Sequence, residues 1–269
     1  MRSPMPETAL TKMLAMLLAQ PPRRWTRTYI NQIVQRANKR IEGLDDREDQ
    51  LAAGRTAPAI DQVAIGAGRQ FRLAVLFLDI CGFSAWPSSD HAEQAVVLKV
   101  MNVFMAEMMN IARDFDGVFE KNTGDGLMAY FGTDASDEAA GVEVAVGAAV
   151  VMHYVNDALI SPWLQREGLY PVRFRIGLDS GEVTIGRVGV PGGLSSFVAI
   201  GATANCACKI MRFIPEGGIC IGNEVFKRLP PGWDRWCTPI ASLTGFVYKL
   251  SGQPYPAWCL DYRLQQPTQ

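Results

Sequence analysis

The sequence lacks the residues that a zinc site or a disulfide framework requires. Its 269 residues include only two histidines, and the six cysteines stand at positions 81, 206, 208, 220, 237 and 259. Only Cys206 and Cys208 are close together, and a C-x-C pair with two histidines in the whole chain does not make a zinc site. We therefore expect a protein with reduced cysteines, as in the cytosol.

The sequence also lacks an excess of positive or negative charge and long hydrophobic runs. The 26 Lys and Arg residues are balanced by 27 Asp and Glu residues, without a long block of one sign, which argues against a nucleic-acid partner. No uninterrupted apolar stretch reaches the roughly 18–20 residues of a membrane span. The nearest candidate, Met13–Ala19, ends at a Gln-Pro-Pro-Arg-Arg sequence, so we expect neither a signal peptide nor membrane attachment.

What the sequence does contain is enough apolar surface for a sizeable core. With 48% hydrophobic and 20% charged residues, the chain is too apolar to be intrinsically disordered. Residues 1–70 are expected to form a helical N-terminal extension, with helices over Thr8–Ala19 and Trp25–Glu42 and a charged tether over Asp45–Arg55, which serves packing or dimerisation. Residues 71–269 are expected to form the main domain.

The main domain alternates strand and helix patterns. Leu73–Leu78 is a continuous apolar run, typical of a buried central strand, and helical spacing follows over His91–Arg113. Further expected strands are 118–123, 127–131, 174–178, 183–187, 197–200 and 219–221, with two more near the C-terminus. Further expected helices are 137–156 (capped by Ser136), 203–213 and 223–229. The pairs 118–123/127–131 and 174–178/183–187 each flank a turn sequence and are expected to be hairpins. This order indicates an α+β fold containing the ferredoxin-like βαββαβ unit.

Two aspartates stand where chemistry is expected. Asp79 ends the apolar strand, and Asp125 lies in a Gly-Asp-Gly turn of the following hairpin. Taken singly, Asp79 could be a helix cap and Asp125 a turn residue. Together, at neighbouring ends of one sheet, they suit hard cations such as Mg²⁺ or Mn²⁺, two of which can activate an attacking oxygen and hold a leaving pyrophosphate. Between them, Cys81, Gly82 and Phe83 offer backbone N–H groups to a phosphate.

Four segments carry a resemblance to class III nucleotide cyclases. They are FLDICGFS (77–84), FEKNTGDGLMA (119–129), RIGLDSG (175–181) and AIGATANCACK (199–209), in the order and spacing of that family. The resemblance covers about residues 71–229. It implies that Asp79, Asp125 and the carbonyl of Ile80 bind two metal ions, Mg²⁺ or Mn²⁺, in each site.

The resemblance also implies roles for the remaining site residues. Asn205 would orient the ribose, Lys209 would stand where the family usually has an arginine against the transition-state phosphate, and Lys121 would read the base. In the family, the metal-binding aspartates come from one subunit, and the residues corresponding to Lys121, Asn205 and Lys209 come from the other. This implies a head-to-tail homodimer with two sites at its interface. The reaction would be in-line attack of the ribose 3′-oxygen on the α-phosphate of a nucleoside triphosphate, with loss of pyrophosphate.

Three residues differ from the usual class III cyclase pattern at positions that affect the choice of substrate. Val198 stands where many adenylate cyclases have an Asp or Thr that accepts a hydrogen bond from adenine, and an aliphatic side chain cannot do so. Lys121 is not the Glu expected for guanine, and Lys209 replaces a planar guanidinium with a point charge. The sequence in this respect resembles the pyrimidine cyclases of bacterial Pycsar antiphage systems, which make cyclic UMP or cyclic CMP for a separate effector. We favour UTP, with CTP next. An adenylate cyclase and a catalytically silent nucleotide-sensing dimerisation module are the alternatives.

Overall fold

The computed structural model describes residues 26–42, 64–122, 124–132, 138–189, 195–214, 217–240 and 245–262. Its helices are α2 (Arg27–Glu42), α3 (His91–Asp114), α4 (Glu138–Val155), α5 (Ser161–Arg166), α6 (Ala202–Ile210) and α7 (Asn223–Phe226). Its strands are β1 (Gly68–Ile80), β2 (Val118–Asn122), β3 (Gly126–Phe131), β4 (Phe174–Gly189), β5 (Ser195–Ile200), β6 (Ile219–Gly222), β7 (Cys237–Pro239) and β8 (Ala257–Leu260). The expected helix 8–19, the tether 45–55 and the capping Ser136 lie outside the described residues.

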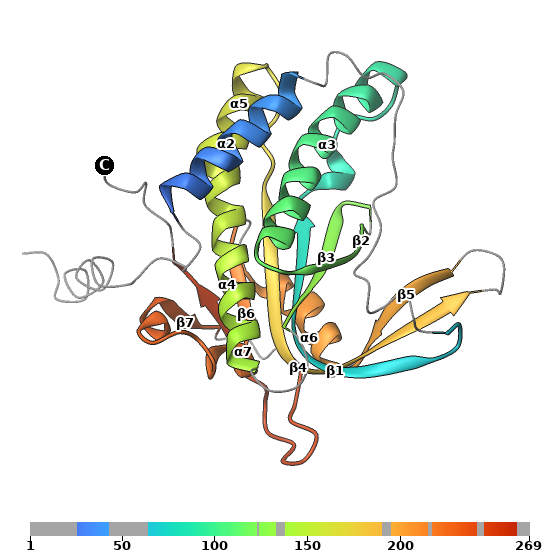
Figure 1. Cartoon of the computed structure of the whole chain (residues 1–269), viewed down its shortest axis with the longest axis vertical. Coiled ribbons are helices and arrows are strands. Elements are labelled where there is room, and N and C mark those ends of the chain that lie inside the picture. The colour runs from blue at the N-terminus through green and yellow to red at the C-terminus, as the bar shows by residue number, and fades with distance from the viewer. Residues whose placement is uncertain are drawn as a thin grey trace, which may run out of the picture.

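These strands form one sheet with β1 near its centre. The strand order is β2-β3-β1-β4-β6-β8-β7, and β5 pairs with β4 off this path (Figure 1). β1 is antiparallel to both β3 and β4, whereas β4 and β6 run parallel. The order β1-α3-β2-β3-α4-β4 is the ferredoxin-like βαββαβ unit, so the predicted α+β fold is confirmed.

The apolar run of β1 is buried on both faces of the sheet. Leu76 and Leu78 belong to the large core under α3 and α4, whereas Val75 belongs to a second cluster together with residues of α6. Side chains alternate along a strand, so both faces of a central strand need apolar residues. By the same alternation, Asp79 lies on the α6 face. The predicted helix 91–113 is also confirmed, and the Asp90 side chain caps it by accepting a 2.8 Å hydrogen bond from the amide of Glu93.

The predicted hairpin over 174–178 and 183–187 is wrong. β4 is continuous through Asp179, Ser180 and Gly181, and residues 174–186 pair without interruption with 68–80 of β1. The hairpin partner of β4 is β5 instead. Asp179 tolerates a central strand because the Tyr255 hydroxyl donates a hydrogen bond to its carboxylate, 2.7 Å away. Two predicted helices are shorter than expected: α6 ends at Ile210 before a 3₁₀ turn, and α7 ends at Phe226.

The described part of the N-terminal extension packs on the main domain. Ile33 of α2 is 1% exposed and belongs to the main core, and Arg36 forms ion pairs with Glu107 (3.0 Å) and Asp114 (2.5 Å) of α3. β1 begins at Gly68, so its first residues come from the segment assigned to the extension.

Two helical stretches, His91–Asp114 and Glu138–Arg166, are long and apolar enough to cross a membrane by length and composition. Both contribute many buried residues to the core beside the sheet (Figure 1), as core helices of globular domains do.

Candidate active site

Asp79 and Asp125 stand side by side at the end of the central strands. In the β1–β3 register Asp79 faces Gly126, the residue directly after Asp125, and the amide of Ile80 donates a 3.1 Å hydrogen bond to the carbonyl of Asp125. Both aspartates are partly exposed. The structure therefore brings together the two carboxylates that the sequence singled out, at the partly exposed end of the central strands β1 and β3.

Arg175 is a functional candidate to which the sequence pattern assigns no role. It opens the third family-like segment and faces Asp79 in the β1–β4 register. Its guanidinium donates to Asp79 Oδ2 from Nη2 (3.0 Å) and Nε (3.3 Å), and both side chains remain about a quarter exposed. The pairing of β1 with β4 reveals this contact, whereas the residues are 96 positions apart in the sequence.

The segment after Asp79 turns sharply. Gly82 adopts a left-handed backbone conformation (φ 70°) and leads into a 3₁₀ turn over Phe83–Ala85, so the long helix α3 begins only at His91. The amide of Cys81 already donates to the carbonyl of Arg173 at 2.8 Å. Of the three predicted phosphate-binding amides, that of Cys81 is therefore engaged within the fold. The amides of Gly82 and Phe83 donate to no backbone carbonyl among the turn and loop hydrogen bonds of the described residues.

The donor set fits a hard divalent cation that shares its coordination with a substrate. Among the described residues, no three His, Cys, Asp or Glu side chains gather into a metal cluster. Two carboxylates and a backbone carbonyl are, however, the kind of incomplete set with which Mg²⁺ is held when substrate phosphates supply the remaining oxygens. Asp79, Asp125 and Ile80 therefore suit a metal–nucleotide complex better than a resident metal cage.

Asn205 and Lys209 share the outer face of α6. They are one helical turn apart and exposed, whereas Thr203, Ala204, Cys206, Ala207 and Ile210 of the same helix are buried. The Lys209 ammonium lies 5.8 Å from the centroid of the Phe246 ring, which comes from the C-terminal hairpin 245–255. No hydrogen bond or ion pair within the described residues joins either side chain to Asp79 or Asp125.

The structure places the two predicted base-reading residues on different strands. Val198 is half-buried on β5, where it pairs with Gly186, 11 positions along β4 from the Arg175 that faces Asp79. At about 3.3 Å per residue this corresponds to roughly 36 Å of strand. Lys121 pairs through its backbone with Met128, beside a register shift in β2. One chain thus does not gather Val198 and Asp79 into one site.

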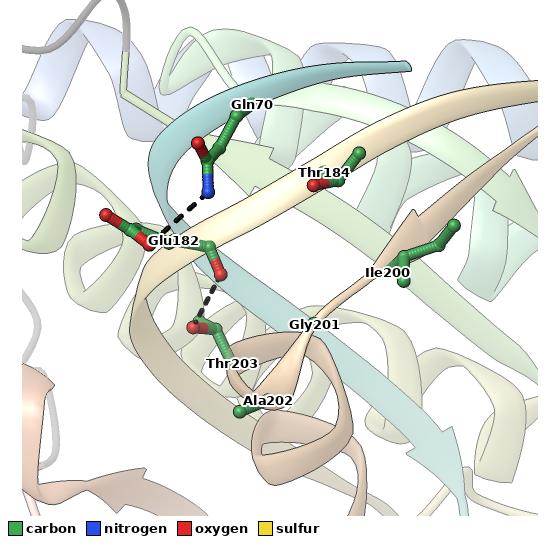
Figure 2. A pocket seen from close by; sticks show the side chains of 7 residues that line it. All are labelled: Gln70, Glu182, Thr184, Ile200, Gly201, Ala202 and Thr203. Atoms are coloured by element: carbon green, nitrogen blue, oxygen red, sulfur yellow. Dashed lines mark hydrogen bonds between the residues drawn. The ribbon is translucent and has the colours of Figure 1, made fainter. Parts of the chain in front are cut away.

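The pocket in Figure 2 lies apart from the predicted site residues. It has a volume of about 420 Å³ and lies where β5 runs into α6; its lining residues are Gln70, Glu182, Thr184, Ile200, Gly201, Ala202 and Thr203. Figure 2 shows Glu182 accepting a hydrogen bond from Gln70 through its carboxylate (3.3 Å) and from Thr203 through its backbone carbonyl (3.1 Å). None of the predicted site residues lines this pocket, and its carboxylate disfavours a phosphate there.

Comparison with known families identifies the family to which the chain belongs. Residues 67–241 match the model of the adenylate and guanylate cyclase catalytic domain. The chain belongs to that family. The resemblance found in the four sequence segments is therefore confirmed, and the fold of this cyclase domain is the one that the resemblance predicted.

Individual relatives are more distant. A cytidylate cyclase from Staphylococcus aureus is 27% identical over 157 residues, which cover 57% of this chain and 36% of the relative. An adenylate cyclase from Anabaena cylindrica is 29% identical over 175 residues, covering 63% and 33%. The chain thus spans about a third of the length of these relatives. The crystal structure of the adenylyl cyclase CyaB from P. aeruginosa superposes with a TM-score of 0.60 at 22% identity, covering 72% of this chain and 95% of that one, which shows the shared fold.

Proposed function

We propose that this cyclase domain is catalytically active and converts a nucleoside triphosphate into a 3′,5′-cyclic nucleotide and pyrophosphate, as a phosphorus–oxygen lyase. The observation that carries the proposal is the pair Asp79 and Asp125. These residues adjoin one another at the partly exposed end of the central strands in a class III cyclase fold. A module kept only for dimerisation would have no need of two neighbouring carboxylates there.

Each group of residues has a defined task in this reaction. Asp79, Asp125 and the carbonyl of Ile80 would hold two divalent ions, Mg²⁺ or Mn²⁺. When bound, these ions lower the pKa of the ribose hydroxyl and offset the charge of the leaving pyrophosphate. The amides of Gly82 and Phe83 bind phosphate oxygens. The guanidinium of Arg175, which pairs with Asp79 in the structure, would contact the same triphosphate.

The second set of residues acts on the sugar and the transition state. Asn205 orients the ribose so that its 3′-hydroxyl, after losing its proton to solvent, forms the new bond to the α-phosphorus in line with the departing pyrophosphate. Lys209 places a positive charge against the α-phosphate as negative charge builds up there. Because these side chains face outward on α6, we propose that they serve the metal segment of a second copy in a head-to-tail homodimer.

A mixing experiment tests the shared site. Asp79→Ala and Asn205→Ala are each expected to abolish turnover. When the two inactive variants are refolded together in equal amounts, half of the dimers are mixed and each mixed dimer contains one intact site. Activity is therefore expected to return to about a quarter of the wild-type value. Two inactive variants that stay inactive together, although affinity pull-down through a tag carried by one variant shows that mixed dimers form, would contradict a site shared between subunits.

The base is proposed to be a pyrimidine. Val198 lacks a polar atom for the adenine amino group, and Lys121 lacks the acceptor for guanine. The sequence alone placed UTP ahead of CTP. The similarity to a cytidylate cyclase makes CTP the first nucleotide to test and UTP the second. The similarity to an adenylate cyclase keeps cyclic AMP as the alternative product.

A product assay separates these outcomes. Purified protein is incubated with Mn²⁺ and, separately, ATP, GTP, CTP or UTP, and the products are resolved against 3′,5′-cyclic standards, with Asp125→Ala as the control. Cyclic CMP or cyclic UMP supports a pyrimidine cyclase, for which we propose a place in the cytoplasm and a separate effector that reads the product in antiphage signalling. Cyclic AMP refutes the pyrimidine proposal. No product from any nucleotide by an intact dimer favours the silent nucleotide-sensing module.

A further inference from the structure

Asp179 is a buried carboxylate to which the proposed reaction gives no task. It lies in the middle of β4 and is 3% exposed. Its side chain accepts hydrogen bonds from the Tyr255 hydroxyl, 2.7 Å away, and from the thiol of Cys206. Within the described residues, no lysine, arginine or histidine forms an ion pair with it. A carboxylate buried without a cation is costly, so its surroundings need an explanation.

Three glycines allow the chain to close around this carboxylate. Gly177 and Gly181 flank Asp179 on the same face of β4. A Cβ atom on Gly177 would lie 2.0 Å from the carbonyl oxygen of Ala207 in α6, and one on Gly181 would lie 2.8 Å from a threonine hydroxyl of the same helix. A Cβ atom on Gly222 would lie 2.3 Å from Asp179 itself. Helix α6 therefore rests directly on the backbone of β4, with the carboxylate enclosed between them.

The two hydrogen bonds of Asp179 lead to the two proposed catalytic side chains of α6. Cys206, 4% exposed, directly follows Asn205 in the helix. Tyr255 belongs to the hairpin 245–255, and its amide donates a 2.8 Å hydrogen bond to the carbonyl of Phe246, whose ring lies under the ammonium of Lys209. The Tyr255 hydroxyl in addition accepts a 3.0 Å hydrogen bond from the amide of Glu224 at the start of α7. One carboxylate thus joins β4, α6, α7 and the hairpin.

We propose that Asp179 is a positioning residue for the cyclase reaction. By holding Cys206 and Tyr255, it fixes α6 against the hairpin 245–255, so that Asn205 and Lys209 reach the nucleotide in one defined orientation. This proposal rests on the proposed cyclase function, because it assigns Asp179 to the same site. It concerns orientation alone: Asp179 lies beneath the helix and does not touch the substrate.

Steady-state kinetics of three variants test the proposal, using the nucleotide that the product assay identifies. Tyr255→Phe removes one donor, Asp179→Ala removes the acceptor, and Asp179→Asn keeps one acceptor oxygen. We expect kcat of Tyr255→Phe and Asp179→Ala to fall about 10- to 100-fold, because small misplacements of reacting groups cost factors of this size. KM should stay within about twofold, because the substrate contacts themselves remain. Asp179→Asn should recover part of the lost kcat.

Tyr248→Phe is the matched control. Tyr248 lies in the same hairpin, its ring packs 5.0 Å from that of Tyr255, and its hydroxyl contacts Asn223 and Glu224 instead of Asp179. We expect its kcat to stay within about twofold of wild type. The proposal is overturned if Tyr255→Phe and Asp179→Ala keep the wild-type kcat, if Tyr248→Phe loses as much as Tyr255→Phe, or if the whole loss appears in KM.

Hydrogen–deuterium exchange provides a readout that does not require activity. In Tyr255→Phe, the amides of residues 203–210 are expected to exchange about tenfold faster or more, whereas those of β1 stay protected. If wild type converts no nucleotide, the proposed function fails, and exchange alone decides whether Asp179 holds α6: faster exchange supports the positioning role and unchanged exchange overturns it. The same measurement remains informative if Asp179→Ala does not fold, because Tyr255→Phe is the milder change.

Discussion

Replacing Asp179 by asparagine should change how the stability of the protein depends on pH. Burial raises the pKa of this carboxyl from its ordinary value of 3.8 to about 6, although hydrogen bonds from Tyr255 and Cys206 oppose the rise and Glu224 adds to it. Cys220 of β6 is the remaining titratable neighbour, and burial raises the pKa of its thiol as well. The folded protein therefore binds the proton of Asp179 more tightly than the unfolded chain does.

The sign and size of the effect follow from this difference. An acid whose pKa is higher in the folded state makes the protein less stable as pH rises, from about pH 4 to about pH 6, and the cost is complete above that range. A rise of about 2 pH units at about 1.4 kcal/mol each amounts to about 3 kcal/mol. Asp179 is almost fully buried, so solvent screening does not reduce this figure much. Asparagine has the shape of aspartate but cannot ionise, so Asp179→Asn should not show this loss of stability as the pH rises.

Urea unfolding at a series of pH values from 4 to 8 measures the effect. The free energy of unfolding of wild type, minus that of Asp179→Asn, should become more negative by about 2.5 kcal/mol between pH 4 and pH 7.5, with most of the change below pH 6.5. Taking the difference cancels the other titrating groups. Asp234→Asn, at an exposed aspartate, is the control and should run parallel to wild type. Parallel curves for wild type and Asp179→Asn would refute the burial argument.

Three further substitutions test other parts of the structure. Arg36→Ala leaves Glu107, which is 0% exposed, without its ion pair to α2, and we expect about 3 kcal/mol lower stability in urea unfolding; a loss below about 1 kcal/mol would contradict this. Gly177→Ala drives a methyl group into the carbonyl of Ala207, and we expect about 1–3 kcal/mol of destabilisation in thermal unfolding together with faster amide exchange in α6. Val198→Asp supplies an acceptor for the adenine amino group, so the ratio of ATP to CTP turnover should rise about tenfold or more; an unchanged ratio would remove Val198 from the base site.

The parts of the fold that could be predicted from the sequence are those whose pattern is local. The helical spacing after His91 reappears with nearly the expected bounds, and the apolar run before Asp79 reappears as the buried part of β1, which begins earlier than expected, at Gly68. The neighbourhood of Asp79 and Asp125 was predictable too, because a strand end and the next hairpin tip meet in a ferredoxin-like sheet. In each case the deciding contacts lie within one element or between elements that the topology makes adjacent.

The parts that could not be predicted depend on distant residues. Asp-Ser-Gly at 179–181 has the composition of a turn, and a buried strand there depends on hydrogen bonds to Asp179 from distant residues, such as the Tyr255 hydroxyl 76 positions further along the chain. Arg175 likewise has the appearance of a solvated charge until the β1–β4 register places it against Asp79. Val198 and Asp79 do not meet within one chain, and the local pattern around either residue gives no sign of their separation along β4.

The stability experiment and the kinetic experiment on Asp179 have more force together than separately. A cost of about 3 kcal/mol is large against the 5–15 kcal/mol by which domains are usually stable, and a single substitution, to asparagine, would remove it. If Asp179→Asn is more stable at neutral pH and turns over more slowly, one ionised carboxylate both destabilises the fold and orients α6, as expected where stability is given up for activity. If the variant is more stable and turns over as fast as wild type, its uncharged oxygen is sufficient, and the hydrogen bonds to Tyr255 and Cys206 position the helix without the charge.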